Sequence, residues 1–234
     1  MRLALQILGY IAAFCLQVMI LQSMRHGAWR RYPLLFVYVV ADLLTNLIEL
    51  RPTLMIESLS KAEQRQFSLI YYWDETIIQA ILFLLVISLI YRASTDVRAR
   101  RMLLAALVCG SILFALISLA LHYDPNVIPG KWMNRWTRDM NFCAAILDLM
   151  LWATLIRTRQ KDSTTLMISG GLGIHFTAGA IGQALRDLTH SSVDVTSVIM
   201  VSANLACLYI WWQALRVSPG TGRPSASASL PLHK

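Results

Sequence analysis

The stretch YPLLFVYVVADLLTNLIEL, residues 32–50, is apolar enough to cross a membrane as a helix, yet it carries a row of polar groups. These groups follow one another at steps of four, four and three, which is the spacing of one helical face. They are Tyr38, Asp42, Asn46 and Glu49. A carboxylate at position 42 lies near the middle of the bilayer, where an ionised side chain is costly. It therefore needs a partner or a watery cavity, and we expect the bundle to be built around this stripe.

The composition of the whole chain is typical of a membrane protein. Hydrophobic residues make up 56% of the 234 residues and charged residues 15%, whereas soluble domains carry about 25% charged residues. The apolar residues form seven continuous runs, each near the ~20 residues that a helix needs to cross ~30 Å of hydrocarbon. These runs are approximately residues 3–24, 32–50, 67–91, 102–123, 138–156, 163–186 and 194–215.

Helices are the expected structure of these runs, because lipid offers the backbone no other hydrogen-bond partners. The sequence therefore predicts an all-α integral membrane protein with a single bundle of seven transmembrane helices over residues 1–216. Residues 217–234, VSPGTGRPSASASLPLHK, are polar and low in complexity, which predicts a disordered cytoplasmic tail.

The cationic side chains predict the orientation of the bundle. Loops after the first, third and fifth runs, together with the tail, hold thirteen of the 21 Lys and Arg residues. These are Arg25, Arg30, Arg31, Arg92, Arg98, Arg100, Arg101, Arg157, Arg159, Lys161, Arg216, Arg223 and Lys234. Cytoplasmic loops are enriched in Lys and Arg. The sequence thus predicts an N-terminus outside, a cytoplasmic C-terminus and a multi-pass protein of the plasma (inner) membrane.

Three other runs carry polar faces at compatible depths. Tyr71, Glu75 and Gln79 follow at steps of four in the third run. Asp148 lies about ten residues into the fifth run, on the same face as Asn141. The sixth run places His175 near its middle. Ionisable groups at such depths are candidates for function.

These faces predict one outward-facing polar cavity that binds a small ligand or ion. Its candidate residues are Tyr38, Asp42, Asn46, Glu49, Tyr71, Glu75, Gln79, Asp148, His175 and Arg186. The alternative for Asp42 and Asp148 is a buried structural hydrogen bond, and for Arg186 an ion pair with an acid at the membrane boundary.

Two features predict close helix packing. The sixth run holds five of the eleven glycines, and Ala178 and Gly182 are spaced as small residues at helix interfaces are. Gln17 lies on a mildly polar face of the first run, where an amide typically hydrogen-bonds a neighbouring helix.

The residues that several known cofactor and catalytic chemistries require are missing from the sequence. No lysine lies inside a run, so a retinal Schiff base has no attachment point. Only His175 lies at mid-membrane, whereas bis-histidine haem needs two, and no HExxH, GxSxG or glycine-rich nucleotide loop occurs. The sequence thus predicts no cofactor, no metal site and no catalytic residue. The net charge of +8 lies at the ends of the runs, which indicates a lipid bilayer as partner and not nucleic acid.

Three functions stay open. The sequence favours a non-enzymatic protein that senses or transports a small ligand or ion. The second interpretation is an intramembrane enzyme that acts on a lipid or isoprenoid substrate with a carboxylate as acid or base. The third is a membrane assembly subunit whose polar groups only join helices. The ligand, the oligomeric state and any protein partner are not predicted.

Overall fold

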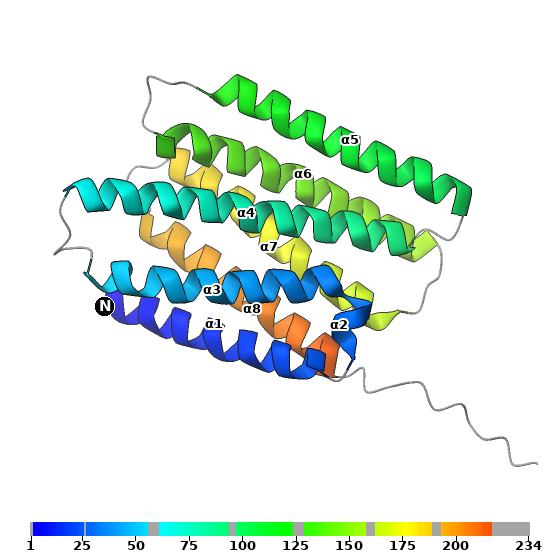
Figure 1. Ribbon diagram of the computed structural model, residues 1–234, viewed down its shortest axis with the longest axis horizontal. Coiled ribbons are helices and arrows are strands. Elements are labelled where there is room, and N and C mark those ends of the chain that lie inside the picture. Colours follow the sequence, from blue (N-terminus) through cyan, green and yellow to red (C-terminus); the bar gives the residue numbers. More distant parts are fainter. Residues whose placement is uncertain are drawn as a thin grey trace, which may run out of the picture.

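The computed structural model describes residues 2–25, 27–55, 61–93, 97–123, 129–157, 162–188 and 193–216, and these residues are almost entirely helical. Figure 1 shows long helices lying side by side along one axis. The helices are α1 (Arg2–Arg25), α2 (Ala28–Arg31), α3 (Pro33–Met55), α4 (Lys61–Ala93), α5 (Val97–His122), α6 (Pro129–Arg157), α7 (Ser163–Leu188) and α8 (Val193–Arg216). The predicted tail, residues 217–234, lies outside the described residues.

Six of these helices are long and apolar enough to cross a membrane: α1, α4, α5, α6, α7 and α8. The predicted all-α membrane fold is confirmed to that extent. The predicted second span corresponds to α3, in which the apolar stretch of described side chains, Pro33–Ile48, is shorter than a full crossing. The helices also extend beyond the predicted runs, since α4 begins at Lys61 and α6 begins at Pro129. Proline is favoured in the first turn of a helix, where its missing N–H has no partner to lose.

The long helices form a closed ring with one helix outside it. Each ring helix packs against two neighbours in the order α1, α3, α4, α6, α7, α8 and back to α1. The ring order differs from the chain order, so α1 and α8, from opposite ends of the sequence, lie side by side (Figure 1). The centre of this ring is shielded from the surroundings on all sides by helices.

Helix α5 is the one outside the ring, packed against α6 and α4. Polar contacts join it to α6 near its C-terminal end. Asp139 accepts a hydrogen bond from Ser118 Oγ at 2.9 Å and lies 2.8 Å from His122 Nε2, while Trp136 Nε1 donates to the Ala115 carbonyl at 3.1 Å. Most of the remaining surface of α5 is exposed and apolar, as expected of a helix that faces lipid.

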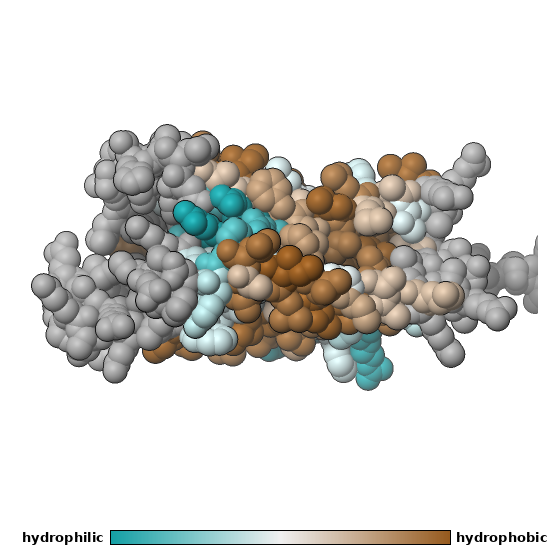
Figure 2. Space-filling view, turned by 90° about the horizontal axis from the view of Figure 1, so that it is seen from above, coloured by the Kyte–Doolittle hydropathy of each residue, from teal (hydrophilic) through white to brown (hydrophobic). Residues whose placement is uncertain are grey.

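One end of the bundle carries an arginine in the last turn of three helices. We call the end where α1, α4 and α8 finish, at Arg25, Arg92 and Arg216, the basic end, and the other the opposite end. Between the ends the surface is apolar. Figure 2 shows brown apolar atoms gathered over the middle of the described part, with a hydrophilic group toward one side. An apolar belt between polar ends is what a bilayer requires.

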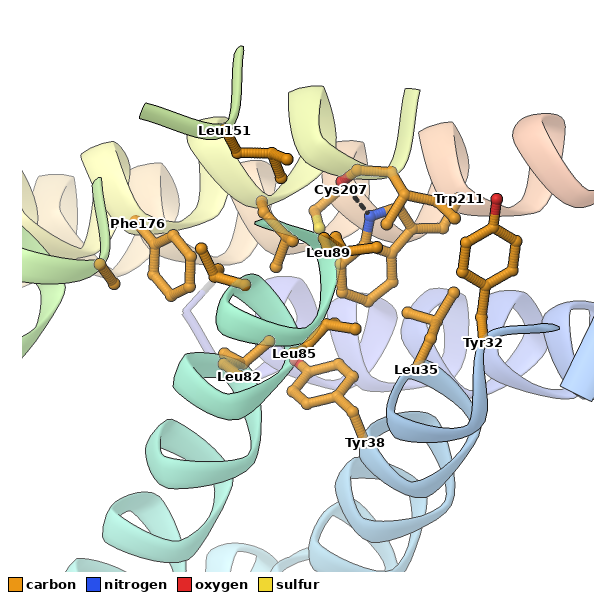
Figure 3. Close-up of a cluster of buried hydrophobic side chains, with 14 of the residues drawn as sticks. Tyr32, Leu35, Tyr38, Leu82, Leu85, Leu89, Leu151, Phe176, Cys207 and Trp211 are labelled. Carbon is orange, nitrogen blue, oxygen red and sulfur yellow. Dashed lines mark hydrogen bonds between the residues drawn. The ribbon is translucent and has the colours of Figure 1, made fainter. Parts of the chain in front are cut away.

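The core of the ring toward the basic end is aromatic. Trp211 of α8 is 1% exposed, and its Nε1 donates to the Ile168 carbonyl of α7 at 2.9 Å. The ring of Tyr38 meets Trp211 edge-on, with centroids 5.4 Å apart and planes at 86° (Figure 3). Leu35, Leu85 and many other buried side chains fill the space around them. This packed layer closes the centre of the ring on the basic side.

The glycines of α7 let its neighbours come close. A Cβ at Gly171 would lie 2.6 Å from Trp211 Nε1, and one at Gly182 would lie 2.9 Å from Met200 Cγ. Distances below 3.0 Å are essentially never seen for real Cβ atoms. The glycine-rich run therefore packs closely, as its small residues predicted.

Candidate functional site

A polar cavity of about 160 Å³ lies inside the ring, between the aromatic layer and the opposite end. Five helices contribute to its wall. The lining residues are Tyr38, Asp42, Glu75, Ile78, Gln79, Asn141, His175, Ala178, Gly179, Gln183, Met200 and Asn204. The volume is several times the roughly 30 Å³ that a water molecule occupies in the liquid, so the cavity has room for a small hydrated ligand.

Helix α3 supplies the deepest carboxylate of the cavity. Asp42 lies one turn from Tyr38, on the face that turns toward the centre of the ring. Its Oδ2 accepts a hydrogen bond of 2.6 Å from Nε2 of Gln17, which α1 holds completely buried. This single amide orients the carboxylate, and it brings the sixth ring helix into the site. Gln17 thus makes the interhelical bond that its sequence position predicted.

A chain of three buried amides crosses the cavity from α4 to α6 to α7. Gln79 Nε2 donates to Asn141 Oδ1 at 2.9 Å, and Asn141 Nδ2 donates to Gln183 Oε1 at 3.4 Å. Asn141 passes directly over the backbone of α7 at Gly179, where a Cβ would lie 2.9 Å from its Nδ2. The glycine therefore creates the space that the middle amide of the chain occupies.

The other ionisable lining groups come from α4 and α7. Glu75 lies one turn before Gln79, and His175 lies one turn before Gly179. His175 is partly buried, with its ring edge-on to Phe176 at a centroid distance of 5.8 Å. Together with Asp42 they give the wall two carboxyl groups and an imidazole, and no Lys or Arg is among the described residues that line it.

The structure brings together five of the ten candidate residues: Tyr38, Asp42, Glu75, Gln79 and His175. Asn46 is partly buried on α3 and does not line the cavity. The side chains of the remaining predicted residues Glu49, Tyr71 and Arg186 lie outside the part that the structure describes.

Asp148 lies at the interface of α6 and α7 and not in the cavity wall. It is 3% exposed, and its Oδ1 accepts a hydrogen bond from Ser169 Oγ at 2.7 Å. Its Oδ2 lies 2.8 Å from where Gly173 would carry a Cβ. These contacts match the structural hydrogen bond that the sequence offered as the alternative for this residue.

Four polar lining or supporting residues were not among the candidates: Gln17, Asn141, Gln183 and Asn204. Spacing alone points to some of them. Gln183 follows His175 and Gly179 at steps of four, and Asn141 precedes Asp148 by two turns. A neutral amide in an apolar run is a weaker sequence signal than a charged group, although a buried amide also needs hydrogen-bond partners.

The described wall combines carboxylate, imidazole and amide groups. Within the described ranges, no group of three His, Cys, Asp or Glu side chains is placed to hold a metal ion. Amides and carboxylates supply directional hydrogen bonds, and carboxylates favour a positively charged guest. Comparisons of the chain with protein-family models, with curated proteins and with solved structures found no match.

Proposed function

We propose that this protein binds a small cationic or polar ligand in the cavity inside the ring and senses it or carries it across the membrane. The observation that carries the proposal is the composition of the described wall: two carboxyl groups, from Asp42 and Glu75, beside His175 and a chain of amides. Acidic groups away from water favour cations, because bulk solvent does not compensate their charge there.

The depth of the lining residues supports access from the opposite end. Glu75 is two residues from the end of the apolar span Trp73–Ala93, whereas Asn141 lies nine residues inside the span Trp132–Ile156. At 1.5 Å per residue, these positions reach from the membrane boundary to about 13 Å depth. The aromatic layer of Tyr38 and Trp211 closes the other side. Such a half-channel suits a sensor, or one state of a transporter.

The proposed topology has seven spans, with α3 as the second. Its 23 residues extend over about 34 Å, which is enough to cross ~30 Å of hydrocarbon. The arginines of the basic end favour that end as the cytoplasmic one. The cavity then faces the outside of the plasma (inner) membrane, in agreement with an external ligand.

The size of the cavity argues against an enzyme acting on lipid or isoprenoid. Sites for drug-sized ligands typically occupy 300–1,000 Å³, and about 160 Å³ inside a closed ring leaves little room for an acyl chain.

The assembly-subunit interpretation is favoured by one observation: the bonds of Gln17, Asn141 and Ser169 all join different helices. A purely structural bundle would show the same bonds.

Reconstitution separates these functions. Wild-type protein in liposomes is expected to bind or move a small cation, measured with Na⁺, K⁺ and protons in turn. Asp42→Asn and Glu75→Gln are expected to weaken that response strongly, while the unfolding temperature stays close to that of wild type. Asp148→Asn is the matched control, because it removes a buried carboxylate that lies outside the cavity wall. Folded Asp42→Asn and Glu75→Gln proteins with unchanged binding and flux would favour the assembly subunit.

A further inference from the structure

A second cavity, of about 270 Å³, lies at the basic end of the bundle and is separate from the polar cavity. Three elements that are distant in sequence form it: the end of α2, the last turn of α4 and the start of α7. Its lining residues are Arg31, Arg92, Ala93, Asp162 and Thr165. Two guanidinium groups and one carboxylate therefore meet in one hollow.

The carboxylate of this cavity is already saturated by its neighbours. Asp162 Oδ2 accepts hydrogen bonds from Arg31 Nη2 at 2.8 Å, from Thr165 Oγ1 at 2.6 Å and from the Tyr32 hydroxyl at 3.4 Å. Partial burial opposes ionisation, but the hydrogen bond from Thr165 and the charge of Arg31 outweigh it and lower the pKa of Asp162. Asp162 is thus ionised at neutral pH, and Arg31 balances its charge.

Arg92 carries the positive charge of this cavity that Asp162 does not neutralise. Its Cζ lies 5.0 Å from the centroid of the Tyr32 ring, and Arg31 Cζ lies 5.5 Å from the same centroid. Tyr32 is 3% exposed, so this aromatic platform is fixed. Among the described residues no carboxylate lies within ion-pair distance of Arg92. Stacking uses the face of a guanidinium and leaves the N–H donors at its edge for other partners.

We propose that this cavity binds a phosphate group, held by Arg92 and by the remaining N–H donors of Arg31. Two arginines against one carboxylate leave the hollow with one net positive charge. Guanidinium forks match the oxygens of a phosphate in pairs, and a stacked arginine is already oriented for such a contact. The volume admits a phosphate with several waters.

The position of the cavity places it at the level of lipid headgroups. Ala93 ends one apolar span and Ser163 begins another. At the same end Trp29 is 44% exposed with Arg30 stacked on it at 5.3 Å, an arrangement typical of the membrane interface. A phosphate can reach this site as the headgroup of an anionic lipid or as a soluble ion.

The test measures binding to the full-length protein in a maltoside detergent, which contains no phosphate. Unfolding temperature and affinity are followed with phosphatidic acid, with inorganic phosphate, and with diacylglycerol and chloride as the phosphate-free counterparts. Stabilisation by phosphatidic acid alone identifies a lipid headgroup site. Stabilisation by inorganic phosphate as well identifies a site for the phosphate group from either source. Stabilisation by neither overturns the proposal.

Variants of Arg92 make the test specific to the cavity. Arg92→Gln is expected to raise the dissociation constant at least about ten-fold, as expected for losing charge-assisted hydrogen bonds. Arg92→Lys keeps the charge without the fork, and it is expected to lie between wild type and Arg92→Gln, which covers the case that the glutamine variant folds poorly. Arg30→Gln, at the same end but outside the cavity, is expected to bind as wild type does. Equal losses in Arg30→Gln and Arg92→Gln would mean attraction by general surface charge and would overturn the assignment.

Discussion

Gly179→Ala is the substitution that most sharply tests the construction of the polar cavity. The added Cβ would lie 2.9 Å from Nδ2 and 3.2 Å from Cγ of Asn141. Ordinary contact begins at 3.4 Å, so the amide must move by about 0.5 Å. Asn141 is 5% exposed and bonded on both sides, and its 3.4 Å bond to Gln183 has little length to spare.

The cost follows from three contributions, two that destabilise the fold and one that stabilises it. Overpacking costs about 1–3 kcal/mol, and weakening a buried hydrogen bond costs about 1 kcal/mol. The higher helix propensity of alanine returns about 1 kcal/mol. We therefore expect a net loss of about 1–3 kcal/mol, which for a chain of this size lowers the unfolding temperature by roughly 2–12 °C. Ligand binding in the cavity is expected to weaken as well, because the amide chain is displaced.

The assay is thermal unfolding of purified variants in one detergent, with Gly110→Ala as the matched control. Gly110 lies within α5, and a Cβ there would meet nothing within 4 Å, so only helix propensity changes. Gly110→Ala is expected to be neutral or slightly stabilising. A double variant that also carries Asn141→Ala is expected to lose less than the sum of its two single changes, because the clash is gone. Gly179→Ala as stable as Gly110→Ala would refute the packing of Asn141 against α7.

Three further predictions concern other positions. Gly171→Ala is expected to lower the unfolding temperature more than Gly179→Ala does, since its Cβ would lie 2.6 Å from the buried Trp211 and the indole has no space to turn; thermal unfolding checks the order. Asp148→Ala is expected to lower the free energy of unfolding by about 1–3 kcal/mol, because it leaves the Ser169 hydroxyl unpaired. Ligand affinity is expected to stay unchanged. A change in affinity would argue against a structural role for Asp148. The lowered pKa of Asp162 means that its ion pair stabilises the fold above about pH 3.8 and is lost as the pH falls below that value; unfolding temperatures of Asp162→Asn are expected to vary less with acidification than those of wild type.

Helical spacing in the sequence predicted part of the cavity because neighbours on one face of a helix stay neighbours in the fold. Tyr38 and Asp42 on α3, and Glu75 and Gln79 on α4, reach the same cavity for that reason. The same spacing grouped Asp148 with the cavity candidates, but the structure places this residue at the interface of α6 and α7. Asn141 and Asp148 share a face of α6, yet the first points into the cavity and the second bonds Ser169.

The arrangement of the helices was not predictable from any single run. A stripe shows which face of a helix is polar, but not which helix lies opposite it, because that depends on tertiary packing. The order of the ring and the position of α5 outside it therefore came from the structure. The sequence did contain one indication of the position of α5. Residues 102–123 contain no Asp, Glu, Lys or Arg, so this helix has no charged side chain that must be kept away from lipid.

The central claim is that a cation-selective cavity inside the ring is reachable from the opposite end, and thiol labelling measures this directly. Ala178→Cys places a thiol in the cavity wall, and the reagents are aminoethyl and sulfonatoethyl methanethiosulfonate, which carry opposite charges. The wild-type protein gives the background from its four native cysteines, and Ile174→Cys, on an exposed apolar position of α7, gives the rate outside the cavity.

Sealed cells or vesicles with their outer face exposed are labelled from outside. We predict that Ala178→Cys reacts faster with the cationic reagent than with the anionic one, and that adding Asp42→Asn and Glu75→Gln removes the preference. Equal rates for the two reagents, or no reaction at position 178 above the wild-type background, would contradict the account.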